Sequence, residues 1–528
     1  MSNEKPFTDA ITSGYTFKSE SFKIGVGMLD GQAVPEAGVF LPFKTLNRHG
    51  LIAGATGTGK TKTLQVLAES LSDASIPVVL MDIKGDLSGI AAAGTPNEKI
   101  SERSAQLGIP FNPAGYPVEL LTLSKQKGVR LRATVSEFGP ILLSKILGLN
   151  DTQAGLVAMI FKYCDDNQMP LLDLKDFIKV LQFISNEGKD EMEKAYGSIS
   201  SSSTGTILRK VIELQQQGAD LFFGETSFEV DDLMRISDDG RGTISILRVT
   251  DIQDKPKLFS TFMLQMLAEL YASSPEVGDQ DKPKLVLFID EAHLIFQEAS
   301  TALLQQIETV IKLIRSKGVG IFFCTQNPMD VPASILSQLG LKVQHALRAF
   351  TAADRKVIKE AAENYPETAF YKTDELLTQL GTGEAFITAL NEKGIPTPLV
   401  HTLLRAPNSR MDILNDTEID ALIGSSKLVA KYNQVIDSES AYEILNAKLN
   451  AAAEIAATAE RQEQEKKEQA ELQKQEEKQA RQEAREPGFF DNPIVKQAGR
   501  TAASIITRSL LGALGLGGRS SKNRKSFF

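Results

Sequence analysis

The chain has 528 residues, of which 42% are hydrophobic and 24% charged, values that are ordinary for a globular protein of about two to four folding units. The net charge of −9 is unevenly distributed, and the −12 on residues 1–450 argues against a broad nucleic-acid surface, so any contact with DNA has to be local. The two distant cysteines, Cys164 and Cys324, match no zinc or redox spacing and are expected to be buried and reduced. The N-terminus lacks a secretory signal, and no stretch has the roughly 20 apolar residues of a membrane-spanning helix, so we expect a cytoplasmic protein.

The first predicted elements are short strands, followed by a strand–helix–strand unit. Residues 1–45 form a short N-terminal β segment, and a buried strand, GLIAG, then leads into a glycine-rich loop and an amphipathic helix, KTKTLQVLAESLSDA. The next buried strand lies in IPVVLMDIKGDL, and both a structural turn and a chemical role are open for its Asp82 and Asp86. This order predicts a parallel sheet covered by helices, with residues 46–135 as the first part of the core.

Residues 136–235 lack this alternation of strands and helices and are predicted to be a helical insertion in the core. The core resumes over residues 236–410. Its buried strands lie in GTISILRV, PKLVLFIDEAH, VGIFFCTQNP and LGLKVQHALRAF, and a hairpin begins at GTGEAFITAL. Residues 411–450 are predicted to be a helical C-terminal extension.

The last two predicted segments differ in charge. Residues 451–486 contain no Gly or Pro and too few large apolar residues for a coiled coil, so we expect a solvated helical linker. Residues 487–528 carry seven basic residues and one acidic residue, whereas residues 1–450 carry a net charge of −12. The tail is therefore predicted to be a basic amphipathic element that docks on a partner protein, an anionic membrane surface or DNA, with a disordered solubilising end as the alternative.

A phosphate-loop motif stands between the first buried strand and its helix. Residues 54–61 fit G-x-x-x-x-G-K-[ST], in which backbone N–H groups close around the phosphates of a nucleoside triphosphate. Lys60 is predicted to supply charge to the β and γ oxygens, and Thr61 to offer its hydroxyl to Mg²⁺. The residues expected to bind ATP are Gly54, Ala55, Thr56, Gly57, Thr58, Gly59, Lys60, Thr61 and Lys62.

Two acids that follow the apolar strand LVLFI predict that the triphosphate is hydrolysed rather than transferred to a bound substrate. Asp290 would hold the Mg²⁺ shell, and Glu291 would polarise a water for attack on the γ-phosphoryl group. Gln326 ends another buried strand, where a polar side chain can sense the γ-phosphate or position the water. The simpler interpretation of each is a polar residue that opens a surface turn.

Hydrolysis also requires positive charge on the transition state beyond that of Lys60 and Mg²⁺. Arg315, in LIRSKG, and Arg348, in HALRAF, are the candidates, although either could form a surface salt bridge instead. An arginine supplied by a neighbouring subunit would require the protein to work as a ring.

Together, the segments NRHGLIAGATGTGKT, MDIKGDL, LFIDEAH, IRSKGVGIFFCTQNP and VQHALRAF resemble those of the HerA-like helicases, in the HerA–FtsK branch of hexameric ATPases that pump double-stranded DNA. The likeness is closest to a bacterial HerA-like group and covers nearly all of residues 20–440. It implies a RecA-like P-loop NTPase core with a mostly parallel sheet, a helical insertion, the short N-terminal β segment and a helical C-terminal tail. The roles that it implies are the phosphate loop for Lys60 and Thr61, metal and water for Asp290 and Glu291, the sensor for Gln326, the trans-acting finger for Arg315 and a second phosphate-sensing arginine for Arg348.

Two features limit what the resemblance implies. HerA proper has an N-terminal β-barrel that helps to clamp its ring and to bind a nuclease, and the chain before Gly54 is too short for that barrel. The likeness therefore does not extend to a nuclease partner or to DNA-end resection. The letters DEAH also occur in tandem-core RNA helicases, but the S-A-T and Q-x-x-G-R-x-G-R elements of that class are absent from the sequence.

The leading functional prediction is a homo-hexameric, ATP-hydrolysing translocase that acts on double-stranded DNA. The alternative is a P-loop ATPase that remodels protein or membrane-linked assemblies without moving DNA, which the acidic body favours. A nucleotide-binding scaffold without turnover is disfavoured because Lys60, Asp290 and Glu291 are all present.

Overall fold

The computed structural model describes residues 4–253, 255–278, 280–297 and 301–483. The chain divides into two compact units, Met1–Ala447 and Lys448–Phe528. The basic tail predicted over residues 487–528 lies outside the described residues. All the predicted site residues belong to the first unit.

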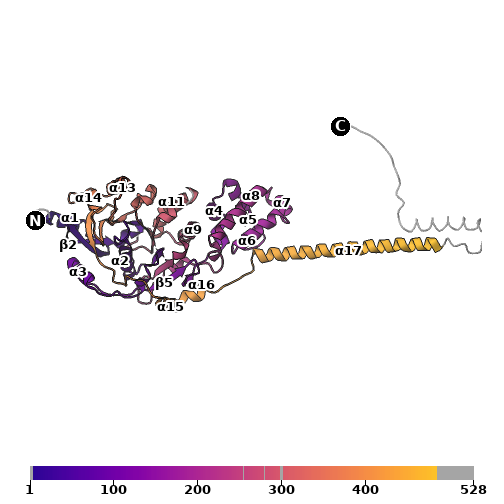
Figure 1. The fold of residues 1–528 in the computed structure, drawn as a ribbon, viewed down its shortest axis with the longest axis horizontal. Helices are drawn as coiled ribbons and strands as arrows, with labels where there is room; N and C mark the ends of the chain where they lie inside the picture. Colours follow the sequence, from indigo (N-terminus) through magenta and orange to yellow (C-terminus); the bar gives the residue numbers. More distant parts are fainter. Residues whose placement is uncertain (1–3, 254, 279, 298–300, 484–528) are drawn as a thin grey trace, which may run out of the picture. The chain divides into compact units, whose positions relative to one another are not determined.

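The first unit is built on one twelve-stranded sheet in the order β2-β1-β12-β11-β10-β3-β9-β8-β4-β7-β5-β6 (Figure 1). The strands from β10 to β6 in this order pair in parallel, and the four at the other end pair antiparallel. Their bounds are β1 Ser21–Leu29, β2 Gln32–Pro42, β3 Gly50–Ala53, β4 Val78–Asp82, β5 Val118–Thr122, β6 Val129–Arg130, β7 Ile244–Arg248, β8 Leu285–Ile289, β9 Val319–Thr325, β10 Leu341–Gln344, β11 Glu384–Thr388 and β12 Val400–Leu404. The predicted mostly parallel sheet is confirmed.

The N-terminal β segment is present, and the structure shows what it does. Its strands β1 and β2 extend the main sheet, because β1 pairs antiparallel with β12 from the far end of the core. A helix that the sequence did not predict, α1 (Glu4–Gly14), precedes them. The residue after it, Tyr15, is buried and donates its hydroxyl to Ile387 O at 2.9 Å or Pro398 O at 2.8 Å. The strand pairing and this hydrogen bond therefore connect the beginning of the core to its end.

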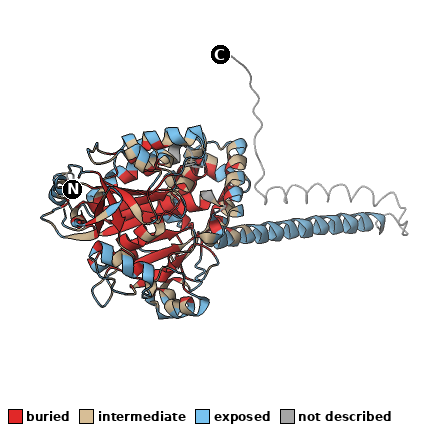
Figure 2. Ribbon diagram, turned by 60° about the vertical axis from the view of Figure 1, so that its left-hand side comes forward, coloured by how far each residue is buried: buried red, intermediate tan, exposed pale blue. Residues whose placement is uncertain are grey.

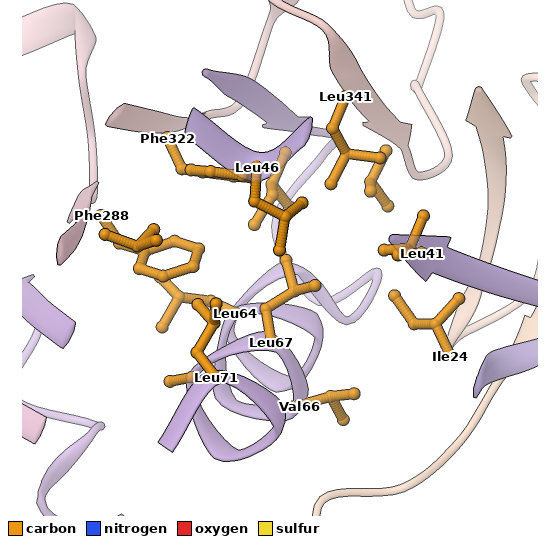
Figure 3. Packing of buried hydrophobic residues seen from close by; sticks show 14 of the residues in the cluster. Ile24, Leu41, Leu46, Leu64, Val66, Leu67, Leu71, Phe288, Phe322 and Leu341 are labelled. Carbon is orange, nitrogen blue, oxygen red and sulfur yellow. The ribbon is translucent and has the colours of Figure 1, made fainter. Parts of the chain in front are cut away.

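The helix after the phosphate loop, α2 (Lys60–Asp73), is held by apolar contacts with the sheet. Leu64, Leu67 and Leu71 lie at helical spacing on its buried face. Figure 3 shows these side chains beside Phe288 of β8 and Phe322 of β9, whose ring centroids are 4.9 Å apart. Burying each such side chain stabilises the fold by about 1.5–3 kcal/mol. This packing fixes the start of α2 against the ends of the central strands.

Other helices of the first unit lie between and around the strands, and buried residues gather in the strands and on the inner helix faces (Figure 2). Those of the core and its C-terminal extension are α3 Glu98–Leu107, α9 Pro256–Ser273, α10 His293–Gln297, α11 Thr301–Ile314, α12 Ala333–Leu336, α13 Ala352–Glu363, α14 Thr373–Leu376, α15 Asp416–Ser425 and α16 Lys427–Tyr432. The helices between β6 and β7, gathered together in Figure 1, are α4 Val135–Ile146, α5 Asp151–Asp166, α6 Leu174–Ser185, α7 Lys189–Tyr196 and α8 Ser201–Gln216.

The helix α17 (Ala441–Glu483) runs through the segment that the sequence predicts as a charged linker. Its first residues belong to the first unit, where Ala441 N donates to Pro170 O at 2.9 Å and Tyr442 N donates to Asp176 Oδ1 at 3.0 Å. From Ala451 to Gln482 its side chains are exposed. None of the described helices combines the length and the apolar character needed to cross a bilayer.

Stability should depend on pH through His49, which is buried where β3 begins. Its Nδ1 accepts from Ile321 N at 3.0 Å and its Nε2 donates to Ile311 O at 2.8 Å, so the ring has to be neutral. Burial lowers the pKa of His49 from 6.5 to about 4. The unfolded chain therefore binds a proton first as the pH falls. The free energy of unfolding should decrease below about pH 6.5, by up to about 1.4 kcal/mol per pH unit, until the folded pKa is reached.

Chemical denaturation of the wild type and of His49→Gln at a series of pH values measures this contribution. Glutamine can still accept and donate but does not titrate, so the variant should be less stable near neutral pH and should lose less stability on acidification. Parallel stability curves for the two proteins would contradict the assignment.

Candidate active site

The phosphate loop, residues 54–59, connects β3 to α2 through a backbone that favours glycine. Gly54 has φ of 151°, and a Cβ there would lie 2.5 Å from the Cβ of His345. Gly59, directly before α2, has φ of 112°. Side chains at such positions would be strained or would collide with the strand beside them. Within the loop, the N–H groups of Gly54, Ala55 and Thr58 donate to backbone carbonyls. An anion would therefore be received by the remaining loop N–H groups and the positive end of α2.

The Lys60 side chain folds back over this loop. Its Nζ donates to Gly54 O at 2.5 Å and to Ala55 O at 3.1 Å. Burial, followed by the nearby charge of Lys84, lowers the pKa of Lys60. A phosphate would replace these carbonyl contacts with stronger charge-assisted ones. Lys62, by contrast, donates to Met411 O at 2.6 Å, so in this structure its side chain contacts the C-terminal extension.

The two predicted acids follow β8, two strands away from β3 in the sheet. Asp290 and Glu291 are both buried, and Glu291 has a positive φ of 46°, which is uncommon for a residue with a side chain. Lys84 Nζ lies 2.5 Å from Glu291 Oε1, and His293 Nδ1 lies 3.2 Å from Oε2. Neither carboxylate oxygen has a well-directed hydrogen bond among the described residues. The carboxylate is therefore held mainly by its ion pair with Lys84; despite burial, this pairing raises the pKa of Lys84.

The turn after β4 brings Lys84 to this place. Asp82 is buried at the end of β4 and accepts from the backbone N–H groups of Gly85 at 2.7 Å, Asp86 at 3.2 Å and Leu87 at 3.2 Å. Burial raises the pKa of Asp82 to about 6, although these bonds favour its charged form. The structure thus gives Asp82 the structural role that the sequence left open, since its bonds shape the turn that carries Lys84.

The acidic groups next to the loop suit a divalent cation. Burial raises the pKa of Asp290 to about 7; Lys84 opposes this rise, and the charges of Glu291 and Asp86 add to it. Asp86 Oδ1 is buried without a hydrogen-bond partner in the described part of the chain. Mg²⁺ usually takes only one or two carboxylates and completes its shell with water and phosphate oxygens. Asp290 and Thr61 fit that requirement, and the negative charge of Asp86 acts on Asp290.

The remaining predicted residues lie at different edges of the sheet. Gln326 is exposed directly after β9, the strand between β3 and β8, and Arg348 is exposed after β10, on the other side of β3. Both belong to the carboxyl edge, where the phosphate loop begins. Arg315 is exposed before β9, at the amino edge. The fold thus places Gln326 and Arg348 on the loop's side of the sheet and Arg315 on the opposite side.

Two neighbours of the phosphate loop were not predicted. Lys84 stands inside the segment MDIKGDL, where a lysine between two acids was the only signal. His345 is buried at the end of β10, and its Nε2 lies 2.9 Å from Thr63 Oγ1 in the first turn of α2. Burial lowers the pKa of His345 to about 4. His345 thus contacts the start of α2 directly after the phosphate loop. Sequence spacing does not reveal this contact between distant segments.

Comparison with known proteins gives one family and several distant relatives. The profile described as "Helicase HerA-like C-terminal" matches residues 28–521. The "DNA double-strand break repair helicase HerA" of Sulfolobus acidocaldarius is 21% identical over 384 residues, which cover 71% of this chain and 68% of the relative. The protein of the same description from Sulfurisphaera tokodaii is 24% identical over 369 residues, covering 69% and 66%. The chain thus spans about two thirds of the length of these relatives.

Among solved structures, the bacterial conjugative coupling protein TrwB in its unbound form aligns over 77% of this chain and 94% of its own. The TM-score is 0.50 and the sequence identity is 13%. This likeness concerns the fold alone.

Proposed function

The chain belongs to the HerA-like helicase family and is a P-loop ATPase with a RecA-like core, and we propose that it uses ATP hydrolysis to move double-stranded DNA through a homo-hexameric ring. The observation that carries this proposal is the arrangement at one edge of the sheet. The phosphate loop, Asp290, Glu291 and Gln326 follow the neighbouring strands β3, β8 and β9. Ligands bind beyond the carboxyl ends of parallel strands, where these residues meet.

In the proposed reaction, the loop N–H groups and Lys60 hold the β- and γ-phosphates of ATP. Thr61 and Asp290 would hold Mg²⁺, which neutralises developing charge on the phosphate oxygens when it is bound. Glu291, as general base, accepts a proton from the attacking water, and Gln326 orients that water. Burial of Glu291 supports this role, because a carboxylate screened from solvent interacts more strongly with a neighbouring water.

The ring part of the proposal rests on where Arg315 lies. It is exposed at the sheet edge opposite to the phosphate loop, so it does not serve the site of its own chain. A copy of the chain packed against that edge would receive the guanidinium at its own site. Arg348, exposed after β10, is proposed to sense phosphate from within the chain.

A second candidate function is remodelling of protein or membrane-linked assemblies without DNA movement. The net charge of −12 on residues 1–450 favours it, since DNA repels an acidic surface. On the translocase proposal, the DNA contact is restricted to a few loops in the ring's pore.

The measurement that separates the two functions is the ATPase rate with and without DNA. Double-stranded DNA should raise the rate of phosphate release, and the stimulation should weaken as salt is added, because counterion release drives phosphate contacts. Glu291→Gln with the same DNA serves as the blank for contaminating ATPases. An ATPase rate unchanged by double-stranded DNA at low salt would exclude the translocase and favour remodelling.

A further inference from the structure

Lys84 forms an ion pair with the proposed catalytic carboxylate, Glu291. In the structure its ammonium is 2.5 Å from Glu291 Oε1, and 36% of its side chain is exposed whereas the Glu291 side chain is almost fully buried. The turn that carries Lys84 is fixed by the three backbone bonds to Asp82. The ammonium group, at the end of a flexible side chain, can move while its backbone stays in place.

The same ammonium lies near Lys60. The two charges are close enough for Lys84 to lower the pKa of Lys60, second only to burial. Two like charges close to each other repel, and an anion bound to both would relieve that repulsion. The γ-phosphate of ATP would be such an anion, whereas ADP has no phosphate at that position.

We propose that Lys84 contacts Glu291 while the site holds no triphosphate and transfers to the γ-phosphate when ATP binds, thereby releasing Glu291 to act on water. This proposal rests on the proposed function, in which Glu291 is the base. It adds a residue that detects the γ-phosphate and couples its arrival to the readiness of the carboxylate.

The state of Glu291 supports such an exchange. A carboxylate paired with an ammonium is a weaker acceptor for the proton of water than a free one. Here the carboxylate is buried and the ammonium 2.5 Å from it is partly exposed. Because the Lys84 ammonium is partly exposed at the end of a flexible side chain, it can leave the carboxylate for a doubly charged phosphate.

The test is a double-mutant cycle on binding, with a non-hydrolysable ATP analogue and ADP as the two probes. Lys84→Met should weaken binding of the analogue by about tenfold or more, as expected for loss of a charge-assisted bond, and leave the affinity for ADP unchanged. Lys84→Arg keeps the charge and should restore part of the preference for the analogue. Glu291→Gln removes the competing charge, so it should strengthen analogue binding relative to ADP in the wild-type background and have no such effect beside Lys84→Met.

Equal losses of affinity for the analogue and for ADP in Lys84→Met would overturn the proposal, since they would indicate a general effect on the site. An effect of Glu291→Gln that is the same with and without Lys84 would also overturn it. Thermal unfolding of each variant shows whether the fold is intact. Because the cycle measures binding alone, it gives its answer even if DNA fails to stimulate hydrolysis, an outcome that would count only against the translocase.

Discussion

Glu291→Gln is expected to bind ATP and to lose turnover by a factor of about 10²–10⁴, the range for loss of a general base. Glutamine has the size of glutamate, so the buried space after β8 stays filled and the phosphate loop is untouched. The substitution removes the negative charge that, in the proposed reaction, polarises the attacking water. Nucleotide affinity by calorimetry and phosphate release by a coupled assay, measured on the same preparation, separate binding from turnover.

Lys60→Ala is the matched contrast, because it removes a charge from the phosphate side of the same site. It should bind ATP poorly and therefore hydrolyse poorly, whereas Glu291→Gln should fail only in hydrolysis. If Glu291→Gln released phosphate at the wild-type rate, the catalytic carboxylate would have to be sought elsewhere. Asp86 would be the first candidate, because its Oδ1 is buried without a hydrogen-bond partner among the described residues.

Arg315→Ala is expected to bind ATP normally and to lose turnover by a factor of about 10³ or more, as for other arginines supplied to a phosphoryl transition state. Since Arg315 lies at the edge away from its own phosphate loop, the loss would arise at the neighbour's site. Mixing the variant into wild-type protein should therefore lower activity out of proportion to its fraction. Lys312→Ala, which removes another exposed basic side chain from the end of α11, is the control. Mixing it into wild-type protein should leave the ATPase activity unchanged.

A linear decrease of activity with the fraction of Arg315→Ala would show that each subunit uses only its own residues. A protein that stays monomeric with ATP at micromolar concentration would contradict the ring itself. Either result would leave the ATPase assignment in place and redirect attention to Arg348, which is exposed on the loop's side of the sheet.

The parts of the site that the sequence predicted are those whose signal is local. Lys60 and Thr61 stand between a buried strand and a helix within one short segment, and Asp290 and Glu291 directly follow five apolar residues. Such patterns set both the element and the edge of the sheet at which a side chain emerges. The position of Arg315 before β9, and thus at the opposite edge, could also have been derived from its place in the chain.

The parts that the sequence did not predict depend on contacts between distant segments. Lys84 meets Glu291 because β4 and β8 are neighbours in the sheet, an order that no spacing along the chain specifies. His345 reaches the loop because β10 pairs with β3. The pairing of β1 with β12 likewise joins residues from opposite ends of the core. Local patterns give the strands, but their neighbours are decided by how the whole core packs.

The fastening of Tyr15 to Ile387, 372 residues later in the chain, has a consequence for how the protein is made. On the ribosome, β1 and β2 emerge long before β12, the strand that β1 pairs with. At about 5–20 residues per second, translation leaves this pair without that partner for roughly 20 s or more. During that interval the apolar side chains of Ile24 and Val26, buried in the finished sheet, are exposed to solvent or bound by a chaperone. The nascent chain should therefore be most prone to aggregation just before the last strands of the sheet are synthesised.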